Sequence, residues 1–301
     1  MNNEDLTTHF DIIVIGGSFA GMSAALQLAR ARRKVLLIDA AVRRNRFAAA
    51  IHAFVGQEGR SPDVFVAAAK AELLAYPNVQ WCEDTAVHSE RLENTFFVRV
   101  QSGQSFRAHG IVLATGLIDE LPEIEGLSQR WGSSIFHCPY CHAYEFGDGR
   151  FGVLAVNGAA HGNAMVMADW GPVVLFTNGS FEPNEAQQDA LKKRGVAIES
   201  ELVVRITDKA SVELADGRVI VLDAILSASR VKMASSIVTQ LGCELEEGPI
   251  GPYVRIDEGM ETSVPGVFAC GDIIRRGRSV PLAVGDGSLA GVAAHQKLIF
   301  Q

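Results

Sequence analysis

The chain has no long hydrophobic run and no excess of basic residues, and each absence excludes a class of protein. A membrane-spanning helix needs about 18 consecutive apolar residues, whereas the most apolar segments, such as 12–15 and 35–38, have only the length of a strand. The 27 Lys and Arg residues are outnumbered by 35 Asp and Glu residues, so the net charge is -8. Nucleic-acid binders usually show a basic excess or a basic face. We therefore expect neither a membrane span nor a nucleic-acid partner.

Cysteine is scarce, and only one pair of cysteines is close in sequence. The five cysteines are Cys82, Cys138, Cys141, Cys243 and Cys270. An odd, scattered set does not fit a framework of structural disulfides. Residues 1–10 are polar and acidic and lack the basic start and apolar run of a secretory signal. The sequence therefore predicts a cytoplasmic protein in a reducing compartment.

The first forty residues show a strand, a tight turn, a helix and a second strand. Asp11 to Ile15 is a short apolar run, residues 16–21 are rich in glycine, and Met22 to Arg30 is rich in Ala and Leu. Lys34 to Ile38 is a second apolar run, which ends at Asp39. This order predicts a βαβ unit with two parallel strands. The chain then continues with a predicted helix at Pro62 to Leu74 and predicted strands at 79–82, 95–100 and 111–114.

A second unit of the same kind begins near Phe151. The pattern predicts a strand at 152–156, a helix at 159–170 and a strand at 173–176, followed by strands at 203–207 and 219–226. The polar stretch 242–251 indicates a return crossing. A strand at 267–269 and a helix from about 282 to 300 then complete the first domain.

Because 301 residues make about twice the length of a typical domain, two domains are expected. The predicted fold class is α/β, with two Rossmann-like nucleotide-binding domains, the second inserted into the first. The predicted boundaries are 1–116 and 245–301 for a discontinuous first domain, and 117–244 for an inserted second domain that contains both close cysteines.

The glycine cluster between the first strand and helix predicts a dinucleotide site. Small residues let the backbone approach a pyrophosphate, whose charge then meets the helix amino terminus. An acid at the end of the second strand binds ribose hydroxyls. Ser18 stands where a second glycine is usual, and a merely structural turn is the alternative. The candidate residues are Gly16, Gly17, Ser18, Phe19, Ala20, Gly21 and Asp39.

The segment His137-Cys138-Pro139-Tyr140-Cys141-His142 predicts redox chemistry. Two cysteines at this spacing can close a small disulfide ring, and a nearby cation or helix start favours a thiolate. Half of a zinc site is the alternative, with His137 and His142 as further ligands. No second pair of this spacing exists in the sequence to complete such a site.

Four motifs together resemble the thioredoxin reductase-like family of FAD-dependent pyridine nucleotide-disulfide oxidoreductases. They are the turn 16–21, Ala114-Thr115-Gly116, the Cys138-Pro139-Tyr140-Cys141 segment and the run 266–272. The resemblance covers nearly the whole chain. It implies that residues 1–116 and 245–301 form an FAD-binding domain and that 117–244 form an NADPH-type domain. It implies that the first motif binds the ADP part of FAD. It also implies that Asp272, after Gly271, holds the ribitol chain, and that Arg278, Ser279 and Val280 lie at the pyrimidine end of the flavin.

The resemblance also implies roles within the cysteine pair. Cys141 is expected to face the flavin, and Cys138 to attack the external disulfide or thiol. The family often has an acid directly after the second cysteine, whereas this chain has His142. Histidine titrates near neutral pH and can exchange a thiol proton, with plain packing on the helix turn as the alternative. Glu145 is a candidate for orienting it.

The second βαβ unit departs from the family pattern at its expected NADPH site. Its turn, 155–160, has one glycine, and no Arg or Lys follows the strand at 173–176 until Lys192. A phosphate without backbone clearance or cations would bind weakly. The sequence therefore predicts a degenerate NADPH site. Arg43, Arg44, Arg46 and the loop through His52 are either a solvated basic loop or contacts to FAD phosphate or adenine.

The leading hypothesis is a flavin-dependent thiol–disulfide oxidoreductase. Its partner is expected to be a thioredoxin-like protein or a small-molecule dithiol or disulfide. Relatives that use ferredoxin, and others that oxidise a small dithiol with oxygen, would tolerate a degenerate second site. A non-catalytic flavin-binding redox sensor is the competing hypothesis from another class. The resemblance alone implies a homodimer.

Overall fold

A computed structural model describes residues 8–275 and 277–300 of the chain, which divide into two compact units. Unit 1 comprises the chain up to Arg46, residues 60–118 and the chain from Val231 onward. Unit 2 comprises residues 47–59 and 119–230. The chain therefore leaves unit 1 and returns to it, as expected for one domain inserted into another. Among the described residues, no helix is long and apolar enough to cross a membrane.

Unit 1 is built on a mixed seven-stranded sheet in the order β3-β2-β1-β6-β5-β4, with β19 pairing with β6 on a separate branch. Strands β1, β2, β3, β6 and β19 run parallel, whereas β4 and β5 form an antiparallel extension. The strands are β1 (Thr8–Ile15), β2 (Val35–Asp39), β3 (Val79–Glu83), β4 (Ala86–Arg91), β5 (Phe96–Val100), β6 (Ser105–Leu113) and β19 (Val267–Ala269). The register pairs Ile12 with Val35 and Ile15 with both Ile38 and Leu113.

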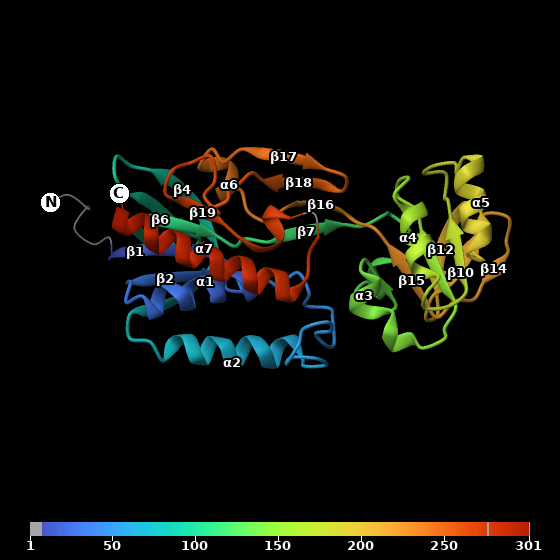
Figure 1. Cartoon of the computed structure of the whole chain (residues 1–301), viewed down its shortest axis with the longest axis horizontal. Coiled ribbons are helices and arrows are strands. Elements are labelled where there is room, and N and C mark those ends of the chain that lie inside the picture. The colour runs from blue at the N-terminus through green and yellow to red at the C-terminus, as the bar shows by residue number, and fades with distance from the viewer. Residues whose placement is uncertain (1–7, 276, 301) are drawn as a thin grey trace. The chain divides into compact units, whose positions relative to one another are not determined.

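The helices of unit 1 are α1 (Phe19–Arg30), α2 (Pro62–Leu74), α6 (Ile237–Gln240) and α7 (Val280–Phe300), with a 3-10 turn η4 (Gly271–Ile274). The helices α1 and α7 run side by side (Figure 1). Glycines let them approach closely, because a Cβ at Gly287 would overlap the Ala20 carbonyl and one at Gly291 would meet the Ala24 carbonyl oxygen. The central strand residues 12–14, 35–37 and 111–113 are fully buried and form the core of the unit.

Unit 2 contains a five-stranded sheet in the order β11-β10-β9-β15-β8, with its pairs parallel. These strands are β8 (Ile135–Phe136), β9 (Phe151–Leu154), β10 (Val173–Phe176), β11 (Ala197–Glu199) and β15 (Ala224–Ser227). A separate antiparallel sheet consists of β12 (Val203–Thr207), β13 (Ser211–Leu214) and β14 (Val219–Ile220). The helices are α3 (Pro139–His142), α4 (Ala160–Met167) and α5 (Glu185–Lys193), with 3-10 turns η2 (Ser128–Arg130) and η3 (Tyr144–Phe146).

The predicted fold class is confirmed, and several predicted elements have the observed bounds, among them α2, β10, β12 and β19. The segment 219–226 differs, because it is two strands and not one. Asp223 interrupts it by accepting the Arg150 N–H (2.9 Å) and pairing with Lys209 (3.5 Å).

The return to unit 1 also differs from the sequence prediction in its details. It falls between Arg230 and Val231, within β16 (Arg230–Met233), which pairs with the outgoing strand β7 (Leu117–Glu120). The predicted polar crossing at 242–251 is a hairpin of β17 (Leu245–Gly248) and β18 (Gly251–Val254). The segment from α6 to β18 belongs to unit 1, because side chains of α6 and β18 are buried in the core of unit 1. The assignment of each unit to a cofactor stays a prediction.

Candidate functional site: a glycine-lined strand edge and a disulfide helix

The predicted flavin-binding segments of unit 1 meet at one edge of its sheet. Because β1, β2, β6 and β19 are parallel, their carboxyl ends lie on the same side. Hydrogen bonds continue the ladder past the strand ends: Gly16 N–H donates to Ile38 O (2.8 Å), Ala114 N–H to Ile15 O (2.8 Å) and Cys270 N–H to Leu113 O (2.9 Å). The turn 16–21, Asp39, the 114–116 segment and Gly271 are thus brought together.

The first turn accepts only glycine at three positions. A Cβ at Gly16, whose φ is +111°, would overlap the Ala114 carbonyl. A Cβ at Gly17 would collide with the Asp39 side chain, and one at Gly21 with the Gly16 carbonyl oxygen. The Gly17 N–H donates to Asp39 Oδ1 (3.2 Å), which fixes the acid beside the turn. Ser18 precedes α1, but its hydroxyl accepts no hydrogen bond from the helix. The first-turn N–H groups of Phe19, Ala20 and Gly21 therefore have no side-chain cap.

The late motif is fixed by an arginine from the basic loop. Asp272 Oδ2 accepts a hydrogen bond from Arg44 Nη1 at 2.8 Å, and both side chains are mostly buried. The Arg278 Nε–H donates to the Asp272 carbonyl (3.1 Å). Ser279 precedes α7, and its Oγ accepts the Leu282 N–H (3.4 Å), while Val280 is the first residue of the helix. Arg44 therefore belongs to a defined ion pair, which the sequence alone left undecided.

The redox pair lies in unit 2, directly after β8. Cys138 precedes α3 and Cys141 lies within it, and the two are joined by a disulfide with a Cα–Cα distance of 5.4 Å. Pro139 begins the helix, where its missing N–H costs nothing. The remaining cysteines, Cys82, Cys243 and Cys270, are free.

The free cysteines are poor nucleophiles, because burial raises the pKa of each of their thiols. Residues 8–275 and 277–300 contain no group of three or more His, Cys, Asp or Glu side chains arranged to hold a metal. The disulfide helix is therefore the place in the described chain where thiol chemistry is expected.

His142 is the last residue of the disulfide helix. Its ring stacks on Phe136, with 5.4 Å between ring centroids and 14° between planes. Burial lowers the pKa of His142 below its ordinary value of 6.5, and the charge of Glu145 opposes this effect. Both ring nitrogens are buried, and neither has a well-formed hydrogen bond to the described residues, although the Cys138 backbone lies near enough to favour the protonated form weakly. His142 is therefore neutral near pH 7 and able to accept a proton.

In the second strand–turn–helix motif, in unit 2, side chains of the chain itself accept the backbone N–H groups. Asn157 Oδ1 accepts the Ala159 N–H (2.9 Å) at the start of α4, where a dinucleotide site would direct N–H groups at phosphate. After β10, Asn178 Oδ1 accepts the Val203 N–H (2.9 Å). The capping role of Asn157 was missed in the sequence, although Asn before Gly is a common turn signal.

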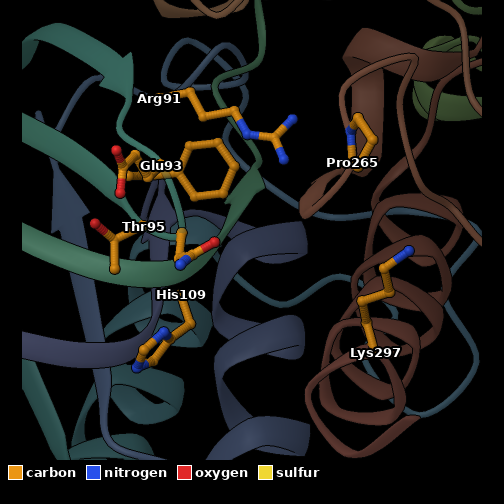
Figure 2. A pocket seen from close by; sticks show the side chains of 8 residues that line it. Arg91, Glu93, Thr95, His109, Pro265 and Lys297 are labelled. Carbon is orange, nitrogen blue, oxygen red and sulfur yellow. The ribbon is translucent and has the colours of Figure 1, made fainter. Parts of the chain in front are cut away.

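A hollow in unit 1 is lined by other residues (Figure 2). Its lining includes Arg91, His109 and Lys297, and none of the predicted site residues. Its cations are engaged within the unit, because Arg91 lies over the Phe96 ring (6.0 Å) and Lys297 pairs with Glu261 (3.2 Å). We assign no function to this hollow.

Comparison with known proteins identifies the family. The family model described as pyridine nucleotide-disulphide oxidoreductase matches residues 10–287. The chain belongs to this family. It is 32% identical over 304 residues to thioredoxin reductase tcpT of Claviceps purpurea, covering 96% of this chain and 94% of that protein.

Two solved structures are also similar to this chain. An oxidoreductase from Agrobacterium tumefaciens matches with a TM-score of 0.95 at 44% identity, covering 97% of this chain and 99% of its own. HlmI matches with a TM-score of 0.89 at 34% identity, covering 97% of this chain and 93% of HlmI. The chain is accordingly an FAD-dependent oxidoreductase with a thioredoxin reductase-like fold, which confirms the predicted family and enzyme class.

The residues at the unit 1 edge fit the FAD that the family implies. The Thr115 hydroxyl, just past β6, is buried and has no hydrogen-bond partner among the described residues. A buried polar group without a partner costs about 1–3 kcal/mol, so a ligand group that bonds to it is favoured. The glycines at 16, 17 and 21 let the turn pack tightly against the Ala114 carbonyl and Asp39, which is the kind of close turn that a dinucleotide-binding motif needs. The tight glycine turn and the Thr115 hydroxyl thus both favour a bound dinucleotide.

Proposed function

We propose that this oxidoreductase exchanges electrons between FAD and an external dithiol or disulfide through Cys138 and Cys141. The observation that supports this most is the Cys138–Cys141 disulfide in the same short helix as the half-buried His142. FAD would be held by residues 16–21, Asp39, residues 114–116, Gly271, Asp272, Ser279 and Val280. In the proposed assignment Cys138 meets the external thiol and Cys141 faces the flavin.

The chain's own residues account for the thiol steps. A substrate thiol gives its proton to neutral His142, and the resulting thiolate attacks the sulfur of Cys138. The Cys138–Cys141 bond breaks, and Cys141 leaves as a thiolate within α3. Bound FAD would supply a two-electron acceptor for the reduced pair.

A small-molecule dithiol oxidase is the form of this function that unit 2 favours. Asn157 occupies the Ala159 N–H that a phosphate would use. Glu199, whose strand β11 pairs with the end of β10 at Phe176, holds Arg218 at 2.6 Å. Asp216 also holds Arg218 at 2.6 Å, and these bonds raise the pKa of Arg218, so this cation is already paired. We infer that the NADPH site is degenerate and that electrons pass from a small dithiol to oxygen or are supplied by ferredoxin. A thioredoxin-like partner remains the alternative that relatives' names suggest.

An anaerobic absorbance titration tests this function. The purified yellow protein is titrated with NADPH in one cuvette and with dithiothreitol in another. Bleaching by dithiothreitol alone is the expected result. Bleaching by equimolar NADPH would show that hydride is still delivered and would contradict the degenerate site. If dithiothreitol reduces the protein once but air then supports no turnover, the redox-sensor hypothesis is favoured over an oxidase.

Two further parts of the proposal are less specific to the site. We propose a homodimer, which the family likeness supports, and sedimentation at micromolar concentration would test it. A cytoplasmic location agrees with the three free cysteines, which a reducing compartment keeps as thiols.

A further inference from the structure

Helix α7 has two apolar faces, and α1 covers one of them (Figure 1). Gly287 and Gly291 bring this face against the α1 backbone, and Ala290 and Ala294 beside them are fully buried. The opposite face is open to solvent, and its exposed residues are Leu282, Gly285, Leu289, Val292, Gln296, Ile299 and Phe300. A helix that is apolar all round is normally buried on every side. The solvent-facing side of α7 is therefore expected to be covered by a partner.

The exposed face of α7 differs from that of a solvated helix in its charge. Within residues 280–300, all of which the structure describes, no Asp, Glu, Lys or Arg is exposed. Asp286 is buried and accepts a hydrogen bond from Arg275 Nε (2.5 Å), and Lys297 is partly buried beside Glu261 (3.2 Å). Helix α5 of unit 2 is the contrast, because its exposed residues include Glu185, Asp189, Lys192 and Lys193. The open face of α7 thus has the composition of an interface and not of a solvated surface.

The exposed residues of α7 follow the spacing of a coiled coil. Six of them, which we call the α7 seam, are Leu282, Gly285, Leu289, Val292, Gln296 and Ile299. Successive members are separated by 3, 4, 3, 4 and 3 residues. This alternation places side chains on a single stripe, which packs against a second helix with the same spacing. A helix of 21 residues is about 30 Å long, so the α7 seam runs along nearly its whole length.

The α7 seam is complementary to a reversed copy of itself. In an antiparallel pair with level midpoints, the opposed residues are Leu282 with Ile299, Leu289 with Val292, and Gly285 with Gln296. Nothing lies within 4 Å of the Cβ position of Gly285, so this glycine leaves room for the longer Gln296 side chain. A parallel pair would instead set Gly285 against Gly285 and leave a gap in the packing. A reversed copy therefore fits the seam better than a parallel one.

We propose that two copies of this chain associate through the α7 seam, with the two helices antiparallel. A two-fold axis brings the same surface of both subunits together, so the surface must be complementary to itself. The α7 seam meets this condition in shape, and because it has no charged side chain, no like charges face each other across the axis. The inference names the surface of the homodimer proposed above and does not depend on the thiol chemistry of unit 2.

Sedimentation velocity of the full-length protein between about 0.1 and 10 µM tests the surface. Leu289→Lys changes the α7 seam, and Leu202→Lys is the matched control, because the two leucines are 58% and 52% exposed but Leu202 lies in unit 2. We expect a dimeric wild type and an unchanged Leu202→Lys variant. Leu289→Lys should raise the dissociation constant of the dimer at least about 30-fold, since it buries an unpaired charge in an apolar contact. Circular dichroism verifies folding.

Cross-linking tests the direction of the helices through a gain of signal. The full-length Leu282→Cys/Ile299→Cys double variant is oxidised with diamide, and linked peptides are identified by mass spectrometry. Within one helix the two positions are about 25 Å apart, so a 282–299 link can form only between copies. We expect this link at the mass of a dimer.

The outcomes separate the surface from the homodimer itself. A dimeric wild type with an unchanged Leu289→Lys variant overturns the α7 seam and leaves the homodimer in place. Links of 282 to 282 and of 299 to 299 overturn the antiparallel pairing. A wild type that stays monomeric up to about 10 µM overturns both the seam and the homodimer.

Discussion

The chain contains two strand–turn–helix units, which differ in how tightly the turn is packed and in whether a side chain occupies the N–H groups at the helix start. In unit 1, Gly16, Gly17 and Gly21 are so crowded by backbone and by Asp39 that any side chain would collide, and Ser18 leaves the helix start uncapped. In unit 2, Gly158 has nothing within 4 Å of its Cβ position, and Asn157 caps the turn. The same local fold is thus arranged for a ligand in one unit and closed in the other. A Rossmann-like fold by itself does not establish a cofactor site.

The largest expected effect is on dithiol turnover and comes from changing the disulfide of unit 2, which is the reactive site of that unit in place of its nucleotide turn. Cys138→Ser or Cys141→Ser should lower dithiol turnover by at least about 10³-fold, because each variant removes one of the two sulfurs that exchange electrons. Bound FAD, measured by absorbance, should be unchanged. Cys82→Ser is the matched control and should keep turnover. Residual turnover near the wild-type rate in either variant would contradict the mechanism.

The next effect concerns the proton acceptor beside that disulfide. His142→Gln should lower turnover at pH 7 about 10²-fold and remove the acidic limb of the pH profile. In wild type this limb should lie below pH 6.5, since burial lowers the pKa of His142 and the neutral form is the base. Turnover from pH 5 to 9 measures both quantities. A wild-type limb above 6.5, or an unchanged limb in the variant, is inconsistent with this role.

A glycine pair tests the comparison of the two turns directly. Gly17→Ala should weaken FAD binding by about 1–3 kcal/mol, because its methyl group would displace Asp39. Gly158→Ala adds the same methyl group where nothing lies within 4 Å of the Cβ position and should leave FAD content unchanged. Flavin retained after dialysis reports both, with circular dichroism to verify folding. Equal flavin loss in both variants would show that the turns do not differ as described.

The smallest effect concerns the cap of the second turn. Asn157→Ala should free the Ala159 N–H and strengthen NADPH binding, measured by fluorescence titration, about two- to fivefold, as expected for one hydrogen bond. Asn184→Ala is the control, because Asn184 also accepts a backbone N–H near a helix start in unit 2, that of Gln187 (2.9 Å), but as the N-cap of α5. If both variants respond equally to NADPH, the Asn157 cap is not what closes the site.

Much of the fold was predictable because local patterns and the parallel sheet agree. The runs at 12–15 and 35–38 form buried parallel strands, and the 62–74 helix has the expected bounds. Where polar and apolar residues mix, as at 219–226 and 242–251, tertiary partners determined the outcome. Asp223 interrupts one segment by bonding to the distant Arg150, and burial against unit 1 organises the other.

The sequence by itself determined the two nucleotide-type units, the glycine turn and the close cysteine pair, since these depend on spacing within a few residues. Only the tertiary structure showed that Arg44 pairs with Asp272 and that His52 lies beside Glu145. Both contacts join residues far apart in the chain. Side-chain direction and burial determine both contacts, and neither can be read from local sequence.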